Sequence, residues 1–552
     1  MPNAVPASVP PEWWRGAVIY EIYVRSFADS NGDGIGDLRG ITARLAYVRD
    51  LGVDAVWLTP FFKSPMADFG YDVEDYTEVD PQFGTLADFD ALAAEAGRLG
   101  LKVVIDLVLS HTSERHPWFR ESRKDWRNSK TGWYVWADPK PDGTPPNNWV
   151  SVFGGPAWQW EPRRRQYYLH NFLKEQPDLN LHQPAVQDAL LDVARFWLDR
   201  GVTGLRLDAA NFYMHDALLR DNPPWPKERP YAGEGRDDNP YYWQRHLYDK
   251  SQPENLAFLR RIRQLLDRYP GAMAVAEVAD DEPVVRTAEY VQAGVLHTAY
   301  NFSFLGKAFD AGAARTVLGE FAATAPEGWP SWAFSNHDSM RLVSRWPRSS
   351  DQPGLAKMLT ALLVSMRGTP FVYQGEELGL PEAEVPFERL RDPYGIAFWP
   401  DYRGRDGCRT PMPWTGEGPG AGFSQVEPWL PVPDEHRRLS VAAQAGDSGS
   451  VLNHVKALLA WRRERPALII GDLQFQTADG PLLVFRRTAD GHAPVWCAFN
   501  FSDQQGSCEW SGDAPLSEFG VHAARQPGEV SLGPHGFVLL EEKAGQETHR
   551  RR

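Results

Sequence analysis

A set of acidic residues, histidines and one arginine recurs near the ends of short runs of β-branched and aromatic residues. The carboxyl ends of parallel strands in a barrel meet at one mouth, so side chains far apart in the sequence would gather there. Charged groups brought together in this way are costly as structure alone, because each of them loses hydration. A functional site is therefore favoured for the set, which comprises Asp106, His111, Arg206, Asp208, Glu277, His337 and Asp338.

Two of these carboxyl groups fit the cleavage of a glycosidic bond. That reaction needs one ionised carboxylate to trap an oxocarbenium-like centre and one protonated carboxyl group to release the leaving oxygen. Arg206 and Asp208 alternate along a predicted strand, so they share a face, and the arginine would keep that carboxylate ionised. Glu277 lies in the apolar run AMAVAEVA, where loss of hydration would raise its pKa toward that of a general acid. The spacing leaves retention and inversion of configuration both open.

Repeated strand and helix patterns would position these groups. Amphipathic helical runs separate the β-branched runs, and several of them end in glycine, which is typical of a helix C-terminus. Eight strands with intervening helices predict an α/β fold, the (β/α)8 TIM barrel. The predicted strands span residues 17–27, 53–62, 102–110, 202–210, 272–279, 298–304, 330–336 and 369–375.

Additions to the barrel are predicted at three places. Residues 107–183, after the third strand, are far too many for a βα loop and predict an inserted domain. A further insert of about 378–450 follows the eighth strand. Residues 468–552 show short alternating runs without helical patterns, which predict a C-terminal antiparallel β-domain. The catalytic barrel is therefore expected to comprise residues 1–106 and 184–467.

The composition excludes several classes of partner. The 552 residues include 58 Lys and Arg against 73 Asp and Glu, and the net charge of −15 opposes binding to nucleic acid or anionic membranes. No apolar run approaches the roughly 18 residues of a membrane span, and the amino terminus lacks the pattern of an export signal. The cysteines, Cys408, Cys497 and Cys508, are too sparse for a disulfide framework. We expect a cytoplasmic protein that acts on a small molecule, and the 22 tryptophans suit the flat faces of sugar rings.

The motifs resemble, in order, those of glycoside hydrolase family 13, the α-amylase family. They are DLVLSH (106–111), QPDLN (176–180), GLRLDAANF (204–212), AVAEV (274–278), FSNHD (334–338) and GTPFVYQGEELG (368–379). The resemblance extends from about Trp13 to residue 465. QPDLN and GRDGCRTPMPW (404–414) are similar to the oligo-1,6-glucosidase and α-glucosidase branch.

The resemblance implies a retaining mechanism with three catalytic carboxyl groups. Asp208 would be the nucleophile that forms a covalent glucosyl intermediate, and Glu277 the acid and then the base. Asp338 would hold sugar hydroxyls and favour ring distortion. His111 and His337 would hydrogen-bond the bound glucose beside Arg206.

The segment DFGYDVEDY (68–76) resembles the family stretch at the blind end of the pocket. Asp68 would grip the terminal glucose, Tyr71 would stack beneath it, and Arg405 would complete this grip. Phe153 and Phe172 are candidate aromatic walls, with core packing as the alternative for each. A closed end admits only a non-reducing terminus, so we expect an exo-acting α-glucosidase for short substrates such as maltose.

The segment DSNGDGIGDL has the spacing of a calcium loop. Asp29, Asn31, Asp33 and Asp37 alternate along it in the manner of EF-hand oxygen ligands. Gly40 stands where an EF-hand has a bidentate glutamate, so a true EF-hand is not expected. The segment also resembles the Ca²⁺-binding or Mg²⁺-binding loop of the oligo-1,6-glucosidase branch, which adds the Ile35 carbonyl as a ligand. The ion would be structural, because two carboxyl groups suffice for glycosyl transfer.

Two departures from the family pattern keep other functions open. Ser110 replaces the usual Asn before the histidine, and Ala209 follows the nucleophile where Val or Thr is common. A small residue there leaves the choice between α-1,4, α-1,6 and sucrose bonds open, and makes room for a sugar, alcohol or phenolic acceptor in place of water. An α-glucosyl transferase and a sucrose isomerase or hydrolase are therefore alternatives, and a non-catalytic protein like transporter heavy chains is a distant one. Monomer and homodimer are both compatible with the sequence.

Overall fold

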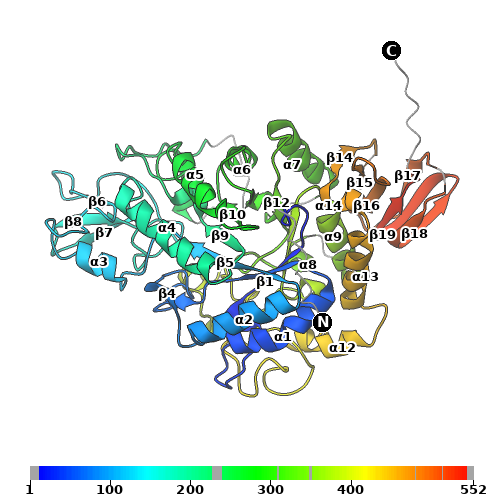
Figure 1. Ribbon diagram of the computed structural model, residues 1–552, viewed down its shortest axis with the longest axis horizontal. Helices are drawn as coiled ribbons and strands as arrows, with labels where there is room; N and C mark the ends of the chain where they lie inside the picture. Colours follow the sequence, from blue (N-terminus) through cyan, green and yellow to red (C-terminus); the bar gives the residue numbers. More distant parts are fainter. Residues whose placement is uncertain are drawn as a thin grey trace, which may run out of the picture.

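A closed barrel of eight parallel strands forms the centre of the protein (Figure 1). The computed structural model describes residues 12–226, 239–306, 310–346, 351–478, 480–512 and 514–543. The sheet order is β11-β10-β9-β5-β2-β1-β13-β12, and a parallel bridge between Ala299 and Pro330 joins its two edges. The predicted TIM barrel is thereby confirmed. Its strands are β1 (Ile19–Ile22), β2 (Ala55–Leu58), β5 (Lys102–Val108), β9 (Gly204–Asp208), β10 (Met273–Val278), β11 (Thr298–Asn301), β12 (Ser331–Ala333) and β13 (Thr369–Tyr373).

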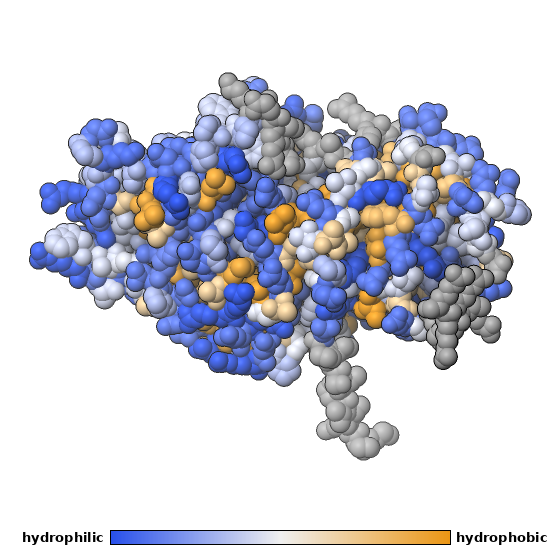
Figure 2. All heavy atoms as spheres, turned by 90° about the horizontal axis from the view of Figure 1, so that it is seen from above, coloured by the Kyte–Doolittle hydropathy of each residue, from blue (hydrophilic) through white to orange (hydrophobic). Residues whose placement is uncertain are grey.

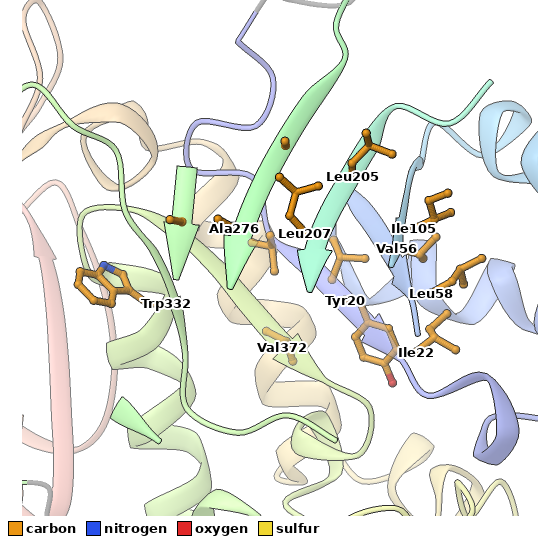
Figure 3. Close-up of a cluster of buried hydrophobic side chains, with 14 of the residues drawn as sticks. Tyr20, Ile22, Val56, Leu58, Ile105, Leu205, Leu207, Ala276, Trp332 and Val372 are labelled. Atoms are coloured by element: carbon orange, nitrogen blue, oxygen red, sulfur yellow. The ribbon is translucent and has the colours of Figure 1, made fainter. Parts of the chain in front are cut away.

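The alternation of side chains along the strands separates the core from the site. Outward residues such as Leu205, Leu207 and Ala276 pack in the large apolar layer beneath the helices (Figure 3). The alternate residues point into the barrel, where an apolar plug that includes Val275 fills the lower part. Glu277 follows Val275 by two positions, so it faces the barrel interior above that plug. The same alternation directs the polar residues of β9 inward.

Helices cover the outside of the barrel. Thr85 and Asp88 form a capping box at the start of α2, and Gly52, with φ 94°, ends α1 in the left-handed conformation that favours glycine. The helices between the strands are α1 (Leu38–Leu51), α2 (Leu86–Arg98), α4 (Pro184–Asp199), α5 (Asn255–Leu266), α6 (Pro283–Tyr290), α7 (Ala311–Thr324), α8 (Leu342–Arg345) and α9 (Gln352–Ser365), and α13 (Val451–Arg463) follows the last strand.

The long segment between β5 and α4 carries its own small sheet. It contains α3 (Pro117–Ser122) and the antiparallel strands β6 (Trp136–Ala137), β7 (Trp158–Glu161) and β8 (Gln166–Leu169), in the order β6-β8-β7. A separate apolar cluster around Trp149 and Trp158 supports it. A bridge between His111 and Asp178 brings the returning chain back to the end of β5. The segment thereby places residues 171–178 beside the barrel mouth.

The second insert and the C-terminal domain complete the chain. Between β13 and α13 lie the short helices α10 (Pro393–Ala397), α11 (Asp434–Arg438) and α12 (Val441–Ala445). Beyond α14 (Pro466–Ile470), antiparallel pairing joins β14 (Asp472–Phe475), β15 (Leu482–Thr488), β16 (Val495–Asn500), β17 (Gly506–Trp510), β18 (Ser517–Gln526) and β19 (Gly528–Glu541). In Figure 1 this sheet lies on the opposite side of the barrel from β6, β7 and β8. The predicted C-terminal β-domain is confirmed.

The surface has an ordinary polar character. On the face shown in Figure 2, hydrophilic residues predominate and hydrophobic residues form small groups among them. Among the described residues, no helix combines the length and the apolar character that crossing a membrane requires.

Candidate active site

A pocket at the carboxyl ends of the barrel strands receives residues from the barrel and from both long inserts. It gathers acidic, basic and aromatic side chains whose sequence positions range from 68 to 405. Its lining includes Asp68, Tyr71, His111, Phe153, Phe172, Gln176, Asp208, Ala209, Phe212, Tyr241, Tyr242, Lys250, Glu277, Phe302, Asp338, Tyr394, Tyr402 and Arg405. The structure therefore brings together most of the residues that the sequence singled out, although Arg206 and His337 lie buried behind the pocket surface.

One guanidinium group holds three carboxyl groups at the bottom of the pocket. Arg206 Nη1 donates to Asp208 Oδ1 at 2.5 Å and to Asp106 Oδ1 at 2.9 Å. Its Nη2 lies 2.5 Å from Glu277 Oε1. The Tyr300 hydroxyl accepts a hydrogen bond from Arg206 at 2.9 Å and donates to Glu277 at 3.1 Å. Asp208 and Glu277 thus both contact the guanidinium group of Arg206, so they face the same part of the pocket.

The electrostatics of this pair suit one ionised and one protonated carboxyl group. Burial raises the pKa of Glu277 to about 7, against the opposing effect of Arg206, and the Asp208 carboxyl adds to the rise. Burial also raises the pKa of Asp208, again against Arg206. The Asp208 carboxyl adds to the rise at Glu277 and the Asp106 carboxyl adds to the rise at Asp208, so ionisation of each group disfavours ionisation of its neighbour. This repulsion favours a state in which one carboxyl group is ionised while another keeps its proton, as a nucleophile and a general acid require.

The backbone turns sharply after Asp208. Ala209 adopts the left-handed conformation, with φ 42° and ψ 45°, which is unfavourable for a residue with a Cβ atom. Its N–H donates to Glu277 Oε2 at 2.9 Å. This turn connects the backbone next to one catalytic candidate directly to the carboxyl group of the other. The small side chain of Ala209 lines the pocket beside both.

Asp338 is the third carboxyl group of the pocket, and two arginines hold it. Arg409 Nη2 donates to Asp338 Oδ1 at 2.5 Å, and Arg405 Nη1 donates to the same oxygen at 3.2 Å. Burial acts to raise the pKa of Asp338, but the neighbouring guanidinium groups of Arg405 and Arg409 hold it well below its usual range. The side chain remains 32% exposed into the pocket. Asp338 is therefore an ionised acceptor that is available to sugar hydroxyls.

Arg405 also closes one end of the pocket. Its Nη2 donates to Asp68 Oδ1 at 2.9 Å and to Asp392 Oδ1 at 2.7 Å. Gln176 Nε2 donates to Asp68 Oδ2 at 3.2 Å and lies 3.1 Å from His111 Nε2. The cross-linked side chains come from the loop after β2, the segment after β5 and the insert after β13. They form a rigid polar wall.

The importance of this wall can be tested at Arg405. We expect Arg405→Lys to raise KM for maltose and to lower kcat/KM about a hundredfold, because lysine cannot reach Asp68 and Asp392 with one planar fork. That loss corresponds to roughly 2–3 kcal/mol, the contribution of one charge-assisted hydrogen bond. The matched control is Arg403→Lys, which alters an exposed arginine paired with Glu384. Equal kinetics for the two variants would contradict the assignment.

Tyr71 and His337 form a stacked pair beneath the pocket. Their ring planes are 7° from parallel, with centroids 5.5 Å apart. The Tyr71 hydroxyl lies 2.5 Å from His337 Nε2 and 3.1 Å from Asp106 Oδ2. His337 itself is 0% exposed and does not line the pocket. The sequence expectation placed His337 against the sugar, whereas the structure places it behind Tyr71.

Aromatic residues form the part of the pocket next to Ala209. Ala209, Phe212 and Tyr241 belong to one apolar cluster, against which Phe172 packs. Phe153 lies with its ring centroid 6.1 Å from that of Phe172, and both rings line the pocket without being fully buried. Of the two interpretations of Phe153 and Phe172, the structure supports the aromatic walls. Charged groups lie against these rings, since Arg405 is 5.3 Å from the Phe153 ring centroid and Lys250 is 5.1 Å from that of Phe212.

The loop that follows β1 was expected to hold a metal ion. Asp29 Oδ2 accepts hydrogen bonds from the Gly34 N–H at 2.9 Å and from the Ser424 hydroxyl at 2.6 Å. Asp37 caps α1 by accepting from the Gly40 N–H at 2.7 Å. Among the described residues, no three His, Cys, Asp or Glu side chains converge on a common point suited to a metal. The loop still presents the oxygen donors that Ca²⁺ and Mg²⁺ prefer, so the ion remains a prediction.

Several residues of the site were not predicted from the sequence. Gln176 lies within QPDLN (176–180) and Arg409 within GRDGCRTPMPW (404–414), so these motifs indicate both residues. No motif indicates Asp392, because it lies in an insert whose path depends on tertiary contacts. Glu21 and Tyr300 stand at inward positions of predicted strands, two residues after Ile19 and Thr298. The alternation of those strands could have revealed them.

Comparisons with known proteins agree with this geometry. The family model "Alpha amylase, catalytic domain" matches residues 21–471. A probable α-glucosidase of Rhizobium meliloti (strain 1021) is 58% identical over 502 residues, which cover 90% of this chain and 91% of the relative. An oligo-1,6-glucosidase of Heyndrickxia coagulans is 35% identical over 540 residues, with 91% and 94% covered. The crystal structure of the α-glucosyl transfer enzyme XgtA is similar with a TM-score of 0.93 at 54% identity, and the match covers 96% of this chain and 100% of that one.

Proposed function

This chain belongs to the α-amylase family, glycoside hydrolase family 13, and on that premise we propose that it is an exo-acting, retaining α-glucosidase. Its substrates are short α-glucosides such as maltose, from which it releases α-glucose at the non-reducing end. The observation that carries this proposal is the wall formed by Asp68, Gln176 and Arg405 beside the paired Asp208 and Glu277. A wall that binds hydroxyl groups accepts a terminal glucose and stops a longer chain from passing.

The two carboxyl groups divide the reaction into two displacements. In the first, an oxygen of Asp208 attacks the anomeric carbon, the glycosidic bond breaks, and the proton of Glu277 passes to the leaving oxygen. In the second, ionised Glu277 takes a proton from water, whose oxygen attacks the anomeric carbon and releases Asp208. Each displacement inverts the carbon, so the product keeps the α-configuration. Asp338 and Arg405 hold the sugar hydroxyls throughout.

Maltotriose labelled at its reducing end tests the exo action. We expect unlabelled glucose and labelled maltose as the first products, because the polar wall can accommodate only the non-reducing glucose. Chromatography of the earliest time points measures the products. Labelled glucose as the first product, or internal cleavage of long glucans, would contradict the blind pocket.

Glucosyl transfer is the second candidate activity, and the apolar cluster around Ala209 favours it. Phe212, Tyr241 and the small Ala209 offer a surface on which an alcohol or a phenol can lie next to Glu277 in place of water. The similarity to the α-glucosyl transfer enzyme XgtA supports this candidate. The sucrose-directed alternative has no comparable support from a specific contact.

A phenolic acceptor distinguishes transfer from hydrolysis. With maltose and excess hydroquinone, we expect hydroquinone α-glucoside to form at the expense of free glucose, since the acceptor competes with water for the same glucosyl intermediate. Chromatography quantifies both products. Glucose release that hydroquinone leaves unchanged would restrict the enzyme to hydrolysis.

We further propose that the loop after β1 binds Ca²⁺ or Mg²⁺ in a structural role. Removal of the ion with a chelator should lower the thermal midpoint, because an ion at a hundredfold its Kd stabilises the fold by about 2.7 kcal/mol. Asp33→Asn should abolish the effect, and initial rates at low temperature should change little. A wild-type midpoint that is indifferent to chelator would refute the ion. The ligands would be Asp29, Asn31, Asp33, the Ile35 carbonyl and Asp37.

A cytoplasmic location and a monomeric or homodimeric state complete the proposal. Cys408, Cys497 and Cys508 are all buried and free, which suits a reducing compartment. The acidic net charge of −15 argues against nucleic acid as a partner. Light scattering of the purified protein would determine the oligomeric state.

A further inference from the structure

Behind the pocket, Glu21 ends a chain of short contacts that the proposed reaction does not use. Its side chain points into the barrel from β1 and is 1% exposed. Its Oε1 accepts a hydrogen bond from the His337 backbone N–H at 3.3 Å and lies 2.5 Å from Nδ1 of His337. Beyond the imidazole, the Tyr71 hydroxyl lies 2.5 Å from Nε2 and 3.1 Å from Asp106. Asp106 in turn binds the same guanidinium nitrogen of Arg206 as Asp208.

The contacts in this chain fix the direction of their protons. Each contact requires one proton between its two heavy atoms, and Tyr71 has only one to give. Asp106 is ion-paired with Arg206 at 2.9 Å, so it accepts and the Tyr71 hydroxyl donates to it. The Tyr71 oxygen must then accept from an N–H at Nε2 of His337. A neutral imidazole with that proton has only a lone pair at Nδ1, so Glu21 must supply the proton of the remaining contact.

An imidazolium facing an ionised Glu21 would contain the same number of protons. Burial disfavours that state, because Glu21 Oε2 has no hydrogen-bond partner among the described residues, and a carboxylate would leave charge on it uncompensated. Burial raises the pKa of Glu21 well above its usual range, although Arg206 opposes this, and burial lowers the pKa of His337 to about 3. Both groups are therefore neutral. The titratable groups that face Glu21 are His337, Arg206, Asp338, Asp106, Tyr300 and Tyr373.

We propose that Glu21 is a positioning residue, a neutral carboxylic acid that donates to His337 and so directs the imidazole and Tyr71 to donate toward Asp106. This arrangement supports Asp106 as an ion and keeps Arg206 in place beside Asp208. It also fixes the Tyr71 ring that lines the pocket. The inference deepens the proposed glucosidase function and rests on it for its kinetic consequence, whereas the placement of the protons can be measured separately.

Two substitutions at Glu21 give opposite expectations. Glu21→Gln keeps an N–H donor for Nδ1 and no ionisable group, so most of kcat should be recovered. Glu21→Leu removes the donor and should lower kcat about tenfold, the cost of one buried hydrogen bond. Glu377→Gln is the matched control, because Glu377 is also buried and bound to tyrosine hydroxyls, those of Tyr20 and Tyr47, outside the pocket.

Nitrogen NMR of the wild-type protein with ¹⁵N-labelled histidine locates the protons directly. The signals of His337, identified by their loss in His337→Gln, should show a protonated Nε2 and an unprotonated Nδ1. A protonated Nδ1, or a folded Glu21→Gln variant as slow as Glu21→Leu, would overturn the inference. If Glu21→Leu does not fold, the Gln variant and the spectrum still decide. The expected spectrum from a protein without glucosidase activity would support the proton placement and overturn the proposed function alone.

Discussion

Replacement of Asp208 by asparagine should lower kcat for maltose by at least about 10⁴-fold while the protein stays folded. The amide cannot form the covalent bond to the anomeric carbon, and no other described side chain takes the place of Asp208 against Arg206 Nη1 on the pocket side. Loss of a nucleophile removes the reaction path itself, so a higher substrate concentration should not restore the rate. Initial rates of glucose release at saturating maltose measure the effect.

The thermal stability of the Asp208→Asn protein should not fall along with its activity. Burial raises the pKa of Asp208, so its ionised form destabilises the folded state, and asparagine removes that cost. Arg206 keeps Asp106 and Glu277 as partners, so no charge is left unpaired. We expect the thermal midpoint to stay the same or to rise.

Asp216→Asn is the matched control for Asp208→Asn. Asp216 is a buried aspartate paired with Arg220 at 2.9 Å, and it does not line the pocket. Its substitution should leave kcat unchanged. Normal turnover by a folded Asp208→Asn protein would refute the nucleophile.

Replacement of Glu277 by glutamine should separate substrates according to their leaving groups. For maltose, whose leaving oxygen needs a proton, we expect kcat to fall by about 10³-fold. For α-glucosyl fluoride, whose leaving group needs much less assistance, the first displacement should remain fast. The glucosyl enzyme would then accumulate, because no base activates water. Added azide should attack it without a base and release α-glucosyl azide, which NMR identifies.

The pH dependence of the wild-type enzyme follows from the same carboxyl group. As the pH rises through about 7, Glu277 loses the proton that the leaving oxygen requires, so kcat/KM for maltose should decline above neutrality. As the pH falls below that of the optimum, Asp208 gains a proton and ceases to be a nucleophile. The two limbs together give a narrow bell-shaped profile.

A second buried glutamate provides the control for this profile. Burial raises the pKa of Glu376 to about 7 as well, but that residue binds Ser335 outside the pocket. Glu376→Gln should keep the decline above neutrality. With α-glucosyl fluoride as substrate, the rate of the first displacement in Glu277→Gln should no longer fall as the pH rises above neutrality. A decline that disappears in Glu376→Gln would contradict the assignment of the acid.

The site residues at the ends of the barrel strands were the most predictable from the sequence. Strand periodicity directs Arg206 and Asp208 to the same side of the sheet, and burial in an apolar run explains the raised pKa of Glu277. The eight strands follow from their β-branched runs, so the barrel was predictable. These features depend on local patterns, which a single sequence contains.

Other features depend on how distant segments meet. Only the family resemblance predicted Arg405 as a site residue. A charged residue in a long insert has no periodicity that indicates where its side chain points. The same is true of its partner Asp392. For His337, the sequence predicted the strand that it follows but not the side chain that covers it. Its place after a strand was predictable, but its position behind Tyr71 depends on the loop after β2, which covers it.

The anomeric configuration of the first glucose released from maltose tests the central claim most directly. Proton NMR follows the anomeric signals from the earliest times, before mutarotation mixes the two forms. Asp208 as nucleophile and Glu277 as acid and base require two inversions, so α-glucose should appear first. Early β-glucose would mean a single displacement by water, and would contradict the covalent intermediate on Asp208.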